Sequence, residues 1–144
     1  MRVLRGLPRL PPPGGCALTI GNFDGVHRGH QAMLALLKGE AQRRGLPTCV
    51  LTFEPHPRDY FSRKLQQPEL APTRVSTLRD TMGELARSGV DLCVVLRFDQ
   101  ALSSLQPQAF IDRILVRALH ASWILVGDDF RFGARRSGDY AMLD

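Results

Sequence analysis

The sequence predicts an α/β domain in which a parallel sheet lies between helices. Short apolar runs with the composition of strands alternate with segments of helical periodicity, in the order β-α-β-α-β-α-β. The predicted strands are apolar at nearly every position, which is typical of strands that are buried on both faces. Helical connections between successive strands indicate parallel pairing. The chain has 144 residues, 44% of them hydrophobic, which is enough for one hydrophobic core.

The predicted strands are apolar runs that are bounded by glycine, proline or charged residues. They cover residues 16–20, 48–53, 90–98 and 122–127. The predicted helices carry apolar side chains at intervals of three and four residues. They cover residues 30–44, 77–88 and about 107–119. Gly45 and Gly89 end the first two helices, Thr77 and Asp80 have the spacing of a capping box, and Pro107 suits a first helical turn.

Two segments are expected to be irregular. Residues 1–15 are rich in proline and glycine, so we expect a flexible lead before a domain that spans residues 16–144. Residues 54–72 contain too many prolines for a regular element. A loop of this length inside a compact domain is usually a lid, a binding loop or a disordered segment.

Composition and charge exclude several classes of protein. The formal charge is +5, but the basic residues are scattered and no basic and aromatic patch indicates a nucleic-acid-binding module. No apolar run approaches the roughly 18 residues of a membrane span, and no export signal is visible, so no membrane partner is expected. The three cysteines flank apolar runs and are expected to be buried and reduced, which favours a cytoplasmic location.

The segment Gly21–His30, GNFDGVHRGH, is the strongest candidate for a functional site because it joins the first predicted strand to the first helix. Ligands of parallel sheets bind at the carboxyl ends of the strands. The glycines allow backbone to approach a ligand closely, and a helix N-terminus offers N–H groups to a phosphate. His27 and His30 are three residues apart, which can place both imidazoles on one side. A zinc pair is the alternative, but no second cluster of ligand spacing accompanies it.

GNFDGVHRGH resembles the GxFDGVHxGH signature of the bacterial FAD synthetases, which are bifunctional riboflavin kinase/FMN adenylyltransferases within the HxGH nucleotidyltransferase superfamily. Two further segments resemble the same family in order and spacing: LTFEPHPRDYF at residues 51–61 and VGDDFRFGARRSGD at residues 126–139. The resemblance extends from about Leu18 onward. It implies a Rossmann-like parallel sheet of the HxGH type.

The resemblance also implies an activity, the transfer of AMP from ATP to FMN to give FAD and pyrophosphate. It implies that His27 and His30 contact the triphosphate. The nucleotide-binding residues that it implies are Gly21, Asn22, Phe23, Asp24 and Gly29. Magnesium would enter with ATP by bridging phosphate oxygens, and its protein ligands are unknown. The FMN phosphate is largely ionised at neutral pH, so no general base is required.

The two other segments are implied to bind the flavin, which is broad, planar and mostly apolar. The residues implied are His56, Pro57, Phe61, Asp129, Phe130 and Phe132. For the two phenylalanines of the later segment, core packing is the alternative. The arginines at positions 131, 135 and 136 could meet phosphates or be solvated.

The sequence departs from the family pattern at its end. Family members carry an ISSTxIR-type phosphate-binding motif and then a riboflavin kinase module, and this sequence stops at Asp144 before either. We therefore expect an incomplete adenylyltransferase domain without riboflavin kinase activity, weakly active or inactive by itself. The alternatives are an HxGH transferase for another phosphorylated acceptor and an inactive nucleotide- or flavin-binding fragment. Oligomeric state is not predicted.

Overall fold

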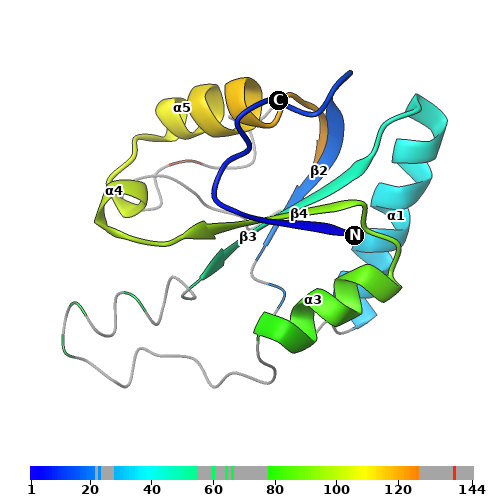
Figure 1. Ribbon diagram of the computed structural model, residues 1–144, viewed down its shortest axis with the longest axis horizontal. Coiled ribbons are helices and arrows are strands. Elements are labelled where there is room, and N and C mark those ends of the chain that lie inside the picture. The colour runs from blue at the N-terminus through cyan, green and yellow to red at the C-terminus, as the bar shows by residue number, and fades with distance from the viewer. Residues whose placement is uncertain are drawn as a thin grey trace.

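The computed structural model describes residues 1–21, 23, 28–54, 60, 64, 66, 78–126 and 138 (Figure 1). Five strands form one sheet in the spatial order β1-β4-β3-β2-β5, and every neighbouring pair is parallel. The strands are β1 (Arg2–Arg5), β2 (Cys16–Ile20), β3 (Thr48–Glu54), β4 (Leu92–Arg97) and β5 (Ala121–Leu125). The parallel sheet that the sequence predicts is therefore confirmed.

Helices cover both faces of the sheet. The helices are α1 (Arg28–Arg44), α3 (Leu78–Arg87), α4 (Gln100–Ser103), α5 (Pro107–Ala109) and, continuing α5 with wider turns, η2 (Phe110–Ala118). Figure 1 shows α1 and α3 on one side of the sheet and α4 and α5 on the other. The three predicted helices are confirmed to within two residues at each end.

The core consists of two apolar layers, one on each face of the sheet. Along β2, Ala17 packs toward α1 and α3, whereas Leu18 packs toward η2. Val50 and Leu51 of β3 alternate in the same way. Successive side chains of a strand point to opposite faces, so a sheet that is covered by helices on both faces has apolar residues at most positions of its strands. All three cysteines are buried free thiols, as predicted.

Strand β1 was not predicted. It pairs with β4 in the register Arg2↔Leu92 to Arg5↔Val95, and its side chains are mostly exposed. We expected this stretch to belong to a flexible lead; the structure instead places it at the edge of the sheet. An edge strand has only one neighbour, so it can form without the continuous apolar run that marks a central strand. The division of the chain at residue 16 stays a prediction.

Helix α4 was also missed because it is a single turn. Asp99 caps its N-terminus: the Asp99 carboxylate accepts a hydrogen bond of 2.9 Å from the N–H of Leu102. Most of residues 54–72, which we expected to be irregular, lie outside the described residues. Within the described part of the chain, no helix is both long and apolar enough to cross a membrane.

Candidate functional site

The strand order of the sheet reverses beside β2. From β2 the chain proceeds to β3 and β4 on one side, and β5 then pairs with the opposite edge of β2. Ligands of open parallel sheets bind outside the carboxyl ends of the strands at such a reversal. The segment Gly21–His30 leaves the carboxyl end of β2 and enters α1, so the motif with the strongest signal in the sequence occupies this position (Figure 1).

Gly21 and Phe23 fix the start of this segment. The N–H of Gly21 donates a hydrogen bond of 3.1 Å to the carbonyl oxygen of Leu51, which extends the pairing of β2 with β3. Phe23 has a left-handed backbone, with φ at 49°. A Cβ atom on Gly21 would lie 2.9 Å from Cε2 of Phe23. Glycine is therefore required here because the phenyl ring folds back over it.

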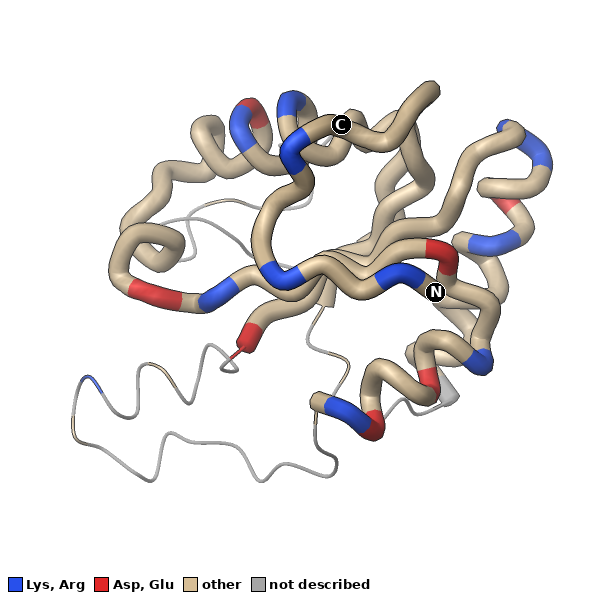
Figure 2. Tube along the Cα trace, in the orientation of Figure 1, with Lys and Arg blue, Asp and Glu red and all other residues tan. Residues whose placement is uncertain are grey.

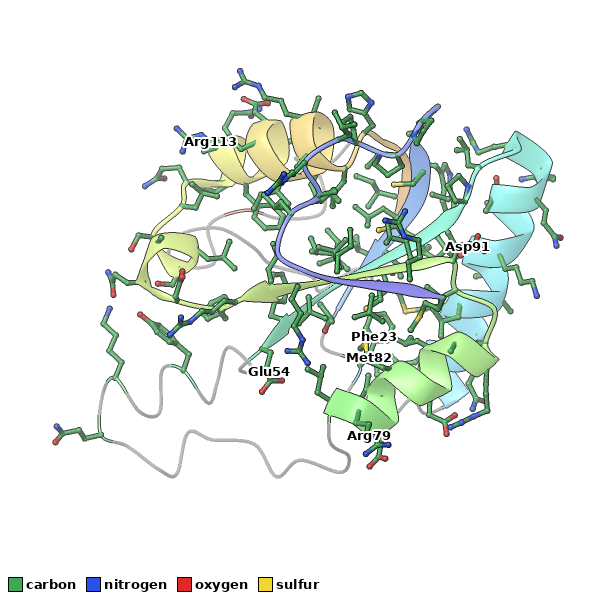
Figure 3. All side chains as sticks on the ribbon, in the orientation of Figure 1. Phe23, Glu54, Arg79, Met82, Asp91 and Arg113 are labelled. Carbon is green, nitrogen blue, oxygen red and sulfur yellow. The ribbon has the colours of Figure 1, made fainter. Side chains whose placement is uncertain are left out.

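The side chain of Phe23 belongs to the core and is only 2% exposed. It joins the apolar layer that contains Leu37 of α1 and Leu85 of α3. Figure 3 shows it next to Met82 of α3. The resemblance assigns Phe23 to nucleotide binding; with its side chain buried in this way, the group that it can offer a nucleotide is its backbone.

His30 lies in the first turn of α1, directly after the exposed Gly29. Its ring is half-buried, with Nδ1 inside the protein, and packs against Phe23 with the ring centroids 4.9 Å apart and the planes tilted by 52°. The imidazole is thereby held at the N-terminus of a helix of 17 residues, where the helix dipole favours negative charge. This arrangement suits the binding of a phosphate group.

Several of the residues assigned from the sequence lie outside the described residues. On the nucleotide side these are Asn22, Asp24 and His27. On the flavin side they are His56, Pro57, Phe61, Asp129, Phe130 and Phe132. The assignments of these residues stay predictions. Among the described residues, the structure brings together Gly21, Phe23, Gly29 and His30 at the carboxyl end of β2.

An aromatic cluster that we did not predict occupies the carboxyl ends of β3 and β4. The ring of Phe98 meets that of Phe53 edge-on, at 5.9 Å between centroids and 83° between planes. It meets the ring of Tyr60 at 5.4 Å and 74°. The sequence does place a phenylalanine, Phe53 or Phe98, at the end of each of two apolar runs. This predicts a contact between the two rings only once the runs are known to be neighbouring parallel strands.

Polar contacts tie the same region to α4. The side-chain oxygen Oε1 of Gln100 accepts hydrogen bonds from the Tyr60 hydroxyl at 3.0 Å and from Nζ of Lys64 at 2.6 Å. The ammonium group of Lys64 lies 5.9 Å from the centroid of the Tyr60 ring. Tyr60 and Lys64 follow the PHP segment in the chain, so Gln100 links the part of the chain after β3 to the helix after β4.

Beyond β3, the same end of the sheet carries a depression of about 370 Å³. It is lined by Arg5, Gly6, Glu54, Val95 and Arg97, which lie at the ends of β1, β3 and β4. The lining thus carries two guanidinium groups and one carboxylate. Elsewhere on the described chain, Lys and Arg are spread over the helices and connections (Figure 2). No group of three or more metal-ligating side chains gathers within the ranges that the structure describes.

Known proteins are similar to this chain over almost its whole length. The Escherichia coli K12 protein named bifunctional riboflavin kinase/FMN adenylyltransferase is 46% identical over 145 residues, which cover 99% of this chain and 45% of that protein. The Pseudomonas fluorescens protein of the same name is 48% identical, over 99% of this chain and 44% of the relative. The chain thus spans less than half the length of the curated relatives that it matches.

The fold is similar to that of a solved structure described as a macrolide-efflux protein from Streptococcus pneumoniae. The two superpose with a TM-score of 0.77 at 26% identity, over 92% of this chain and 43% of the other. The family described as FAD synthetase matches residues 11–144, which include the β2–α1 segment with Gly21 and His30 and both of the segments expected on the flavin side. The chain therefore belongs to the FAD synthetase family.

Proposed function

We propose that this chain is an FMN adenylyltransferase, which transfers AMP from ATP to FMN and releases pyrophosphate. The observation that carries the proposal is the position of the Gly21–His30 segment, which runs from the carboxyl end of β2 into α1 where the strand order reverses. Family membership supports it. Of the two activities in the names of the relatives, adenylyl transfer is the one that makes FAD, the product in the family's description.

The reaction needs alignment and charge neutralisation more than proton transfer. An oxygen of the FMN phosphate forms a bond to the α-phosphorus of ATP, and the bond from that phosphorus to the bridging oxygen of the β-phosphate breaks. The nucleophile is already ionised near neutral pH. The protein's task is to place the two phosphates in line and to stabilise the charge on the oxygens around phosphorus.

The residues of the β2–α1 segment suit the nucleotide side of this task. The proposal places the triphosphate at the N-terminus of α1, where backbone N–H groups and the helix dipole favour anions. His27 and His30 contact the phosphates in this arrangement. Asn22, Phe23 and Asp24 bind the nucleotide in this proposal. Phe23 does so through its backbone, because its side chain is buried in the core. Gly29 is exposed in the first turn of α1, so it offers backbone without a side chain in the way.

The flavin side of the proposal rests on the segments that follow β3 and β5. The carboxyl ends of both strands lie on the same side of the sheet as that of β2, because β3 and β5 each pair with β2 in parallel. The residues proposed to bind the flavin are His56, Pro57, Phe61, Asp129, Phe130 and Phe132. The partners proposed are thus the small molecules ATP and FMN. Mg²⁺ enters with ATP, and no protein ligand is assigned to it. Buried free thiols support a cytoplasmic site for the reaction.

The decisive experiment incubates the purified chain with FMN, ATP and Mg²⁺ and measures FAD by chromatography. Turnover of the chain by itself is expected to be slow, and His30→Gln should lower the rate of FAD formation about 100-fold below that of the parent chain, because it removes a charge-stabilising group from the transferring phosphate. The matched control is His120→Asn at the opposite end of the sheet, where φ is 49° and asparagine is tolerated. It should leave the rate unchanged.

A second measurement separates acceptor identity from turnover. FMN should raise the melting temperature of the chain in a thermal-shift assay, even if turnover is slow. Glycerol phosphate and phosphopantetheine serve as competing acceptors. If one of these is adenylated or stabilises the chain while FMN does neither, the acceptor is wrong. If ATP itself gives no shift and no product forms, the nucleotidyltransferase proposal fails.

A further inference from the structure

We propose that Thr81 of α3 is a positioning residue that, through Phe23, sets the orientation of His30. The inference rests on the proposed function for its kinetic consequence, but its structural content can be tested without turnover. Thr81 touches neither substrate in this proposal. It acts on the reaction through two contacts: its hydrogen bond to the backbone of Phe23, and the contact of the Phe23 ring with His30.

The first contact is a buried hydrogen bond between elements that are far apart in sequence. The hydroxyl of Thr81 donates to the carbonyl oxygen of Phe23 at 3.3 Å, across 58 positions of the chain. Thr81 is 2% exposed. Phe23 has the left-handed φ that side chains with a Cβ rarely adopt, so its conformation must be held by its surroundings. The hydroxyl of Thr81 supplies one such restraint.

Packing supplies the second restraint. The ring of Phe23 shares the apolar layer with Leu85, one turn after Thr81 on α3, and Met82 packs against the same layer. Figure 3 shows Phe23 and Met82 next to each other between the sheet and α3. Helix α3 therefore holds Phe23 both by its carbonyl oxygen and by its ring.

The second contact carries this restraint to the site. The rings of Phe23 and His30 lie 4.9 Å apart, so a displacement of the Phe23 backbone changes the surface against which the imidazole packs. The Nδ1 atom of His30 is buried, so this part of the imidazole lies inside the protein, and the ring of Phe23 is one of the surfaces that it packs against. A small misplacement of a group that aligns reactants lowers the rate without removing any contact to the substrate.

The test compares Thr81→Val, which keeps the shape and removes the hydroxyl, with Thr81→Ser, which keeps the hydroxyl. Thr81→Val should lower kcat/KM for ATP about five- to tenfold, the equivalent of one lost hydrogen bond, and leave KM for FMN within about twofold. Thr81→Ser should restore kcat/KM for ATP to within about twofold. Ser88→Ala is the matched control. It removes another hydroxyl-to-carbonyl bond, 2.9 Å long, which runs from the residue directly after α3 to Glu84 within the helix.

A spectroscopic readout separates positioning from stability. The Phe23 ring shifts the proton resonances of the His30 imidazole, so Thr81→Val should move these resonances in the NMR spectrum, whereas Ser88→Ala should not. The proposal is overturned if Thr81→Val only lowers the melting temperature, with kcat/KM for ATP and the His30 resonances unchanged at 25 °C. If FMN is not the acceptor, the function proposed above fails, but the movement of the His30 resonances still decides this inference.

Discussion

Thr48 and Asp91 exchange three hydrogen bonds at the amino ends of β3 and β4. The Asp91 carboxylate accepts from the N–H of Thr48 at 2.9 Å and from its hydroxyl at 3.2 Å. The hydroxyl oxygen of Thr48 in turn accepts from the N–H of Asp91 at 2.9 Å. These bonds fix the two strands at the point where their pairing begins. Figure 3 shows Asp91 far from Glu54, the last residue of β3, which lies at the carboxyl ends of the strands.

Asp91→Ala should therefore destabilise the fold without changing the chemistry. It leaves the N–H of Thr48, a residue only 3% exposed, without its acceptor, which costs about 2 kcal/mol. Asp91→Asn keeps an oxygen acceptor and should cost less than half as much. Urea unfolding measures both values. The proposed site lies at the carboxyl ends of the strands, whereas Asp91 lies at their amino ends. A loss of FAD formation in folded Asp91→Ala would contradict this separation of stability from chemistry.

Gly21→Ala should damage the site through Phe23. The new Cβ would lie 2.9 Å from Cε2 of that ring, so the ring must move, at a cost of about 1 to 3 kcal/mol. We expect KM for ATP to rise and the free energy of unfolding to fall. Gly39→Ala is the control: it lies within α1 with no atom within 4 Å of the new Cβ. It should stabilise the helix by about 0.5 to 1 kcal/mol. Equal effects of the two variants would refute the role given to Gly21.

The sequence predicted the parts of the fold that depend on local pattern. Most described residues of the four predicted strands are buried or half-buried and belong to apolar runs that can be read directly from the sequence. Strand β1 could not be predicted in this way, because it has no apolar run: Arg2 and Arg5 belong to the sheet only through their pairing with β4. The motif placed Phe23 at the site but gave no sign that its side chain faces the core. Its contact with Thr81 spans 58 positions, and no local pattern reports a contact of that range.

Gln100→Ala should weaken the binding of FMN more than that of ATP. Its Oε1 holds Tyr60 and Lys64, which lie in the segment that begins with the residues proposed for the flavin. The bonds are exposed, so their loss should raise KM for FMN only about threefold. The control is Gln108→Ala. It removes a comparable exposed hydrogen bond, 3.0 Å long, from Gln108 to Asp112, and both of these residues lie after α4 in the chain. A change in KM for ATP alone would contradict the assignment.

Cys93 should make the fold less stable in alkaline solution. Burial raises the pKa of its thiol from 9.0 to about 12. Below pH 9 the thiol is protonated in both states, so it has no effect. Above pH 9 the unfolded chain loses this proton while the folded chain keeps it, so the free energy of unfolding falls as the pH rises toward 12.

The size of this effect is at most about 1.4 kcal/mol per pH unit for one thiol. Urea unfolding at several pH values above 8 measures it, and Cys93→Ala shows which part of the slope belongs to this residue. The variant loses stability at every pH because it leaves a cavity, but its slope should be shallower than that of the parent chain. Identical slopes would mean that the Cys93 thiol ionises as easily in the folded protein as in the unfolded chain.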